Sequence, residues 1–129
     1  AEWIATDAGP ITDRAARAFL GLLATEPDTL VATAHGPAVA RETTARARAV
    51  VEPGRERGST DGVTSRRGDT PPTAAAVHGV DRAEAAALAT AFVDEGINPG
   101  TTADLTCAAL YVALRRGVPI GGGASGGDA

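Results

Sequence analysis

The sequence predicts an all-α protein. In about five segments apolar residues recur every three or four positions, which is the spacing of one helix face. Capping residues, prolines and glycines stand at the ends of these segments, where helices begin and end. No segment alternates apolar and polar residues over a useful length, so no strand is expected. The expected fold is therefore a bundle of about five helices.

Three of these helices are expected before a long loop and two after it. Their ranges are 12–25, 28–36, 37–51, 81–96 and 99–117. Thr12, Asp28 and Asp81 stand where N-caps are expected, because a short polar side chain there can accept hydrogen bonds from free backbone N–H groups. Gly36 and Gly96 are expected to end helices in the left-handed conformation.

Two stretches are expected to lie outside the helical bundle. Residues 52–77 are rich in arginine, glycine and proline and contain almost no large apolar side chain. Such a segment cannot offset its ordering entropy by burial, so it is expected to form a long flexible loop. Residues 118–129 are glycine-rich and are expected to be a disordered tail. The remainder of residues 1–117 is expected to form a single helical domain.

Composition excludes several functions. A net charge of −4 and an aromatic content of 3% argue against nucleic-acid binding, which depends on clustered positive charge and stacking side chains. No apolar run approaches the roughly 18 residues that a membrane helix needs. Cys107 is the single cysteine, so no intrachain disulfide can form and a reducing cytoplasm is the expected location.

The stretch "GINPGTTADLTCAAL", residues 96–110, concentrates polar side chains at an expected helix start. Free N–H groups there can bind phosphate, and Gly100 would allow close approach of a ligand. Thr101 and Thr102 could donate hydroxyls, and Asp104 could hold Mg²⁺. The alternative needs no ligand: Thr101 and Asp104 have capping-box spacing, and Asn98 shapes the turn. From the residues alone, capping is the stronger interpretation.

A second stretch, "PDTLVATAHG", contains Asp28, Thr29 and His35. An acid and a histidine on one helix could act as a base, a phosphate contact or metal ligands. Alternatively, Asp28 caps the helix and His35 interacts with its C-terminal dipole. His78 is expected to be solvated, and Cys107 is expected to be a small core residue.

Together, "LLATEPDTLVATAHGPAVA" and "GINPGTTADLTCAALYVAL" resemble the C-terminal half of the triphosphoribosyl-dephospho-CoA synthase family. The "DT…HG" and "NPG…ADL" blocks carry the resemblance in this order. It implies ATP and 3′-dephospho-CoA as substrates, transfer of the triphosphoribosyl unit to the ribose of dephospho-CoA, release of adenine, and Mg²⁺.

The resemblance also assigns site residues. Asp104, His35 and Asp28 would be catalytic, and Asp104 would also bind the metal. The implied substrate contacts are Thr29, Gly36, Asn98, Gly100, Thr101 and Thr102. Family members carry an N-terminal half with further acid- and histidine-containing motifs, so an N-terminal half or subunit is an implied partner. The alternative from a different class is a non-catalytic all-helical interaction domain whose caps imitate a site.

Overall fold

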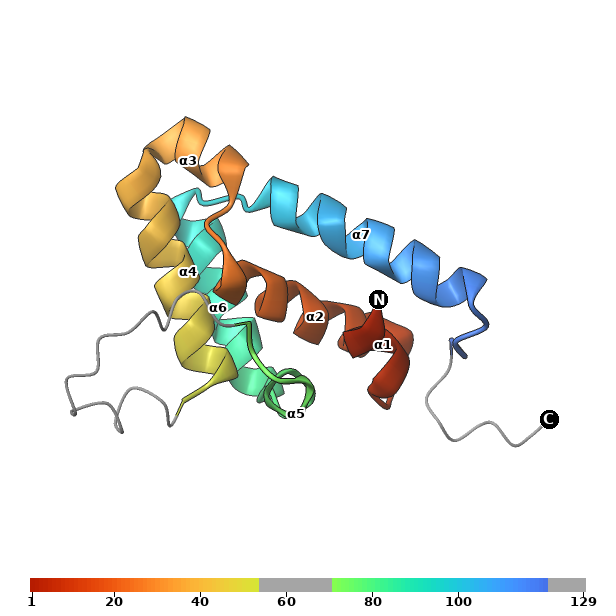
Figure 1. Ribbon diagram of the computed structural model, residues 1–129. Coiled ribbons are helices and arrows are strands. Elements are labelled where there is room, and N and C mark those ends of the chain that lie inside the picture. The colour runs from red at the N-terminus through yellow and green to blue at the C-terminus, as the bar shows by residue number, and fades with distance from the viewer. Residues whose placement is uncertain (54–70, 121–129) are drawn as a thin grey trace.

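A computed structural model describes residues 1–53 and 71–120, and all regular structure in these ranges is helical (Figure 1). The helices are α1 (Glu2–Thr6), α2 (Ile11–Thr25), α3 (Thr29–His35), α4 (Pro37–Val51), α5 (Ala74–His78), α6 (Arg82–Glu95) and α7 (Gly100–Arg115). The prediction of an all-α fold is confirmed. Each expected helix is present, and α1 and α5 are additional short helices that the periodicity did not predict.

Helix α2 lies at the centre of the arrangement. It packs against α1, α4, α5 and α7, while α3 contacts α4 and α7, and α6 packs on α4. The core is built mainly of small and medium side chains, which let the helices approach closely. Its most deeply buried apolar residues are Ile4, Leu23, Ala24, Val31, Ala40, Ala47, Val77 and Ala113.

Gly21 permits the closest of these approaches. A Cβ atom at this position of α2 would lie 2.6 Å from Cζ3 of Trp3 and 2.9 Å from Cγ2 of Val77. Both distances are shorter than a van der Waals contact. The missing side chain therefore makes room for α1 and α5 on the same face of α2.

The expected start of the first long helix was wrong. Thr12 does not cap α2, which begins at Ile11 with Pro10 in the N-cap position and no side-chain cap bond. The turn at Gly9, with φ of 95°, and the extended Pro10 start the helix before Thr12 is reached.

The expected loop also ends earlier than residue 77. Helix α5 begins at Ala74 because the Thr73 hydroxyl accepts a hydrogen bond from the Ala76 N–H and because Val77 is fully buried. Residues 54–70 of the expected loop lie outside the described residues.

Part of the expected tail packs on the bundle. The Val118 N–H donates to the Ala113 carbonyl, and the Ile11 N–H donates to the Ile120 carbonyl. Arg14, only 4% exposed, donates to the Pro119 carbonyl at 2.5 Å. Residues 121–129 of the expected tail lie outside the described residues.

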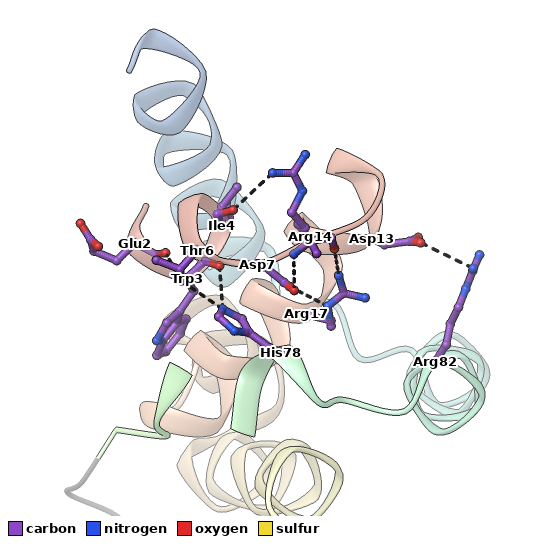
Figure 2. A network of polar contacts seen from close by, with 11 residues as sticks. Glu2, Trp3, Ile4, Thr6, Asp7, Asp13, Arg14, Arg17, His78 and Arg82 are labelled. Carbon is purple, nitrogen blue, oxygen red and sulfur yellow. Dashed lines mark hydrogen bonds and ion pairs between the residues drawn. The ribbon is translucent and has the colours of Figure 1, made fainter. Parts of the chain in front are cut away.

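Polar contacts hold the short helix α1 in place (Figure 2). Nε of Arg17 donates to Oδ2 of Asp7 at 2.7 Å, just after the end of α1. His78 lies at the end of α5, and its Nε2 is 3.2 Å from the Trp3 carbonyl oxygen and 3.1 Å from Oγ1 of Thr6. The expectation of a solvated His78 was therefore wrong, because α5 brings its ring against α1.

One ion pair ties α6 to α4. The Arg46 guanidinium binds Glu95 in a bidentate arrangement, at 2.8 and 2.9 Å, and lies 5.0 Å from the centre of the Phe92 ring. The hydrogen bonds from Arg46 lower the pKa of Glu95 below its ordinary value. No helix in the described ranges is both long enough and apolar enough to cross a membrane.

We predict that Gly21→Ala lowers the stability of the protein. Alanine would favour the helix by about 1 kcal/mol, but its methyl group would overlap Trp3 and Val77, and overpacking costs about 1–3 kcal/mol. The measurement is urea denaturation followed by the fluorescence of Trp3, the single tryptophan. Ala16→Gly, on an exposed position of α2, is the control that measures helix propensity alone. A more stable Gly21→Ala variant would contradict the close approach of α1 and α5.

Candidate functional site

The carboxylate of Asp28 joins the N-termini of two helices. Its Oδ1 accepts hydrogen bonds from the N–H groups of Leu30 at 2.8 Å and Val31 at 3.0 Å, in the first turn of α3. Its Oδ2 accepts bonds from the N–H of Thr102 at 2.6 Å and from the Thr102 hydroxyl at 2.7 Å, in the first turn of α7. With the Asp28 residue only 2% exposed, one buried carboxylate caps both helices.

The hydrogen bonds between Asp28 and Thr102 replace the cap that the sequence suggested for α7. The helix begins at Gly100 with Pro99 in the N-cap position and no local side-chain cap bond. The capping box of Thr101 and Asp104 is therefore not formed, because both residues already lie inside the helix. The Thr102 N–H lacks an intrahelical partner at this position, and Asp28 supplies one from a different helix.

Two more contacts join the motif stretches. At one end, the hydroxyls of Thr29 and Thr101 lie 2.7 Å apart. Close by, a Cβ atom on Gly100 would lie 2.6 Å from Cδ2 of Leu30, so Gly100 allows α7 to begin directly against α3. The glycine thus serves packing between the two helices.

The other end of α3 meets the turn before α7. Nε2 of His35 is 3.0 Å from the carbonyl oxygen of Gly96, the left-handed residue that ends α6. The two stretches found in the sequence therefore form one structural unit, held together near each end of α3. We call this unit the α3–α7 junction, comprising residues 28–36 and 96–102.

A cavity of about 200 Å³ opens at the Asp28 end of the junction. It is lined by Leu22, Thr25, Glu26, Pro27, Asp28, Thr29, Thr101, Thr102 and Leu105. Ligand pockets commonly enclose about 300–1,000 Å³, so this cavity is smaller than a typical site for a whole ligand. Its polar lining is made of threonine hydroxyls and two carboxyl groups, and it contains no arginine.

The predicted site residues fall into two groups. Asp28, Thr29, Thr101 and Thr102 come together around the cavity. The others are not among its lining residues: His35, Gly36, Asn98, Gly100 and Asp104. His35 is separated from Asp28 by the length of α3, about 10 Å at 1.5 Å per residue.

The predicted metal ligand Asp104 is exposed and lies on α7, two residues beyond the junction. Among the described residues there is no group of three or more His, Cys, Asp or Glu side chains that could hold a metal ion. Magnesium in nucleotide sites is held by one or two carboxylates together with the substrate phosphates. The described side chains do not form a magnesium site of their own, and no step is assigned to the ion.

Glu26 is the titratable cavity residue that is absent from the predicted site residues. It lies in the "EPD" turn between α2 and α3, is exposed, and lines the cavity close in sequence to Asp28. An acid two positions before a capping aspartate was the available signal, but its relation to Thr101 depends on the tertiary fold.

Asp28 is held in its charged form. Burial by itself would raise the pKa of this carboxyl group, but the hydrogen bonds from the Thr102 hydroxyl and from three backbone N–H groups outweigh it, so the pKa lies below its ordinary value. With four donors on its two oxygens, Asp28 is suited to positioning the junction.

The fold and the junction define a helical protein in which two separated sequence blocks line one side of a small cavity whose polar groups are threonine hydroxyls and carboxyl groups. The chain belongs to the family described as CitG, ATP:dephospho-CoA triphosphoribosyl transferase, whose model matches residues 1–119. The match covers nearly the whole chain and confirms the family resemblance seen in the two blocks. No curated protein and no solved structure matches the chain.

We predict that Asp28→Asn destabilises the protein by roughly 2 kcal/mol at pH 7. An amide has a single acceptor oxygen, so it cannot receive the donors of both α3 and α7. Asp81→Asn is the matched control, because Asp81 caps α6 by the same local pattern but is exposed and has no bond to another helix. Asparagine is as good an N-cap as aspartate, so this control should change stability little. Equal effects of the two variants would contradict the dual cap.

We also predict that the effect of Asp28→Asn on stability depends on pH. Because the folded-state pKa of Asp28 is lowered, its stabilising contribution is fully present above the ordinary value of about 3.9 and is lost as the pH falls through the folded-state pKa. The difference in unfolding free energy between the wild type and Asp28→Asn should therefore be constant near neutral pH and narrow below about pH 4. Urea denaturation between pH 7 and pH 3 measures it, and a difference that widens on acidification would contradict the assignment.

Proposed function

We propose that the chain contributes to transfer of a triphosphoribosyl unit from ATP to 3′-dephospho-CoA, giving 2′-(5″-triphosphoribosyl)-3′-dephospho-CoA and adenine. Membership of the transferase family supports ATP and dephospho-CoA as substrates. The observation that carries the proposal is the α3–α7 junction, in which Asp28 brings both motif stretches to the edge of one small cavity.

The cavity is suited to a ribose. Threonine hydroxyls can donate to and accept from sugar hydroxyls, and Thr29 and Thr101 lie together in the lining. Two carboxyl groups without an arginine would repel a triphosphate, so the phosphates belong outside the cavity. The start of α7 also has fewer free N–H groups to bind a phosphate than expected, because the Thr102 N–H already donates to Asp28.

In the proposed step, the 2′-hydroxyl oxygen of dephospho-CoA attacks C1″ of the ATP ribose. The C1″–N9 bond breaks, and adenine leaves with its electron pair and takes up a proton. We infer that Glu26 would accept the proton of the attacking hydroxyl, and the position of this exposed residue in the cavity lining supports that role. Asp28 would position Thr102 and the start of α7, acting through the junction.

The residues with the remaining predicted roles lie outside this cavity. His35 holds the second end of the junction through Gly96, and Asp104 lies on the exposed face of α7. Their catalytic roles, and binding of Mg²⁺ by Asp104, stay predictions, as does the cytoplasmic location. The N-terminal half or subunit implied by the family resemblance would supply the groups that hold the triphosphate.

We predict that Glu26→Gln lowers the rate of adenine release by about 10²-fold or more, the usual contribution of a general base, while binding of dephospho-CoA is retained. The assay separates adenine by chromatography after incubation with Mg-ATP and dephospho-CoA, with and without the N-terminal half. Calorimetry measures dephospho-CoA binding to each variant.

Glu42→Gln is the matched control, because Glu42 is an exposed glutamate on α4 that does not line the cavity. An unchanged rate in Glu26→Gln would remove Glu26 from the mechanism. If the folded wild-type chain shows neither heat with the two substrates nor activity after addition of the N-terminal half, the transferase proposal fails. A non-catalytic helical interaction domain would then be the remaining interpretation.

A further inference from the structure

The outer face of α7 carries a continuous apolar strip. Leu105 is 56% exposed, Tyr111 64%, Val112 38% and Leu114 39%, and Cys107 and Ala108 are exposed beside them. The expectation that Cys107 is a core residue was therefore wrong, because it lies on the outer face of α7. The opposite face of the helix is buried through Thr102, Thr106 and Ala113. Figure 1 shows α7 lying along one side of the molecule, with α2 on its inner side. The strip is therefore not covered by the described part of the chain.

The residues of this face follow coiled-coil spacing. Asp104, Ala108, Tyr111 and Arg115 are separated by four, three and four positions, so they form a straight seam along the helix. Leu105 and Val112 flank the seam on one side, and Cys107 and Leu114 flank it on the other. All eight residues are exposed. We call this set the outer seam of α7.

The outer seam is complementary to itself when two copies run antiparallel. Asp104 of one copy then faces Arg115 of the other at both ends of the pair. In the middle, the small Ala108 faces the large Tyr111, again twice. In a parallel pair each residue would face its own copy, which would bring together two Asp104 carboxylates and two Arg115 guanidiniums. Charge and side-chain volume both select the antiparallel arrangement.

We propose that the outer seam of α7 is a dimer interface, and that its occupant is α7 of a second copy of this chain. The contact is isologous, since each pairing occurs twice about a two-fold axis between Ala108 and Tyr111. Burial of Leu105, Val112 and Leu114 drives association, and the end pairs of Asp104 and Arg115 set the direction. The interface adjoins the proposed transfer site, because Leu105 also lines the cavity, so its tests measure mass and thiol reactivity instead of transfer.

The first experiment measures the molecular mass of the full chain by sedimentation equilibrium over a wide concentration range. The expected result is a monomer–dimer equilibrium that Leu105→Asp abolishes. Cys107, the single cysteine, supplies an independent readout, because its reaction with a thiol reagent should slow as the dimer forms. A chain that stays monomeric at every concentration overturns the proposal. Coverage of the outer seam by a different helical partner would give the same monomeric result and would overturn it as well.

The second experiment tests the antiparallel pairing. Asp104→Arg and Arg115→Asp should each weaken the dimer by about tenfold or more, because each places like charges together at both ends. The double variant restores opposite charges and should restore dimerisation. Asp94→Arg and Arg41→Asp are matched controls, since both residues are exposed and lie on other helices.

The double variant keeps the test informative if a single variant folds poorly, and circular dichroism checks the helix content of each. A dimer that persists in both single variants, or a double variant no better than either single one, overturns the antiparallel interface.

Discussion

The Asp28 carboxylate is the interaction on which the arrangement of the other motif residues depends. Helix α3 has seven residues, too few to be stable alone, and α7 begins without a local cap. The buried Asp28 carboxylate caps both helices, because it accepts two hydrogen bonds from each of them. Because burial of an unpaired charge is costly, the carboxylate is stable only when both helices are in place. The same bonds that fold the junction therefore fix the position of Thr29 against Thr101.

Small side chains set the limits of the rest of the bundle. Alanine, valine and one helical glycine let α2 contact several helices at close range, as at Trp3 and Val77. Such a core buries less apolar area per residue than one rich in large side chains, so polar links contribute at its edges. Arg46 with Glu95 and Arg17 with Asp7 have this role. Most of the larger apolar residues of α7, apart from the partly buried Leu110, lie on its outer face, which supports the proposed contact with a second helix.

The family match and the geometry of the cavity make different contributions to the functional argument. The match shows membership of a transferase family that uses ATP and dephospho-CoA. The cavity supports the proposal that a ribose binds there instead of a phosphate, because its polar groups are threonine hydroxyls and carboxyl groups. Glu26 enters the proposal only through this geometry. Family membership alone does not distinguish the motif residues that line the cavity from those that lie outside it.

The sequence by itself determined the helices whose signals are local. Periodic apolar residues predicted α2, α4, α6 and α7, and Asp28 and Asp81 were recognised as caps because each acts on the residues directly after it. Helices α1 and α5 have five residues each, too short to show a period. Their positions depend on packing around Gly21 and on contacts of His78.

Only the tertiary structure decided how the two motif stretches are used. The bond from Thr102 to Asp28 spans 74 positions, so no local pattern could reveal that the cap of α7 comes from the start of α3. Local spacing instead suggested Thr101 and Asp104 as a capping box. A free N–H group donates to whichever carboxylate the fold brings within reach, and sequence shows only the nearby candidates. The residues of the junction could therefore be named in advance, whereas their pairing required the three-dimensional arrangement.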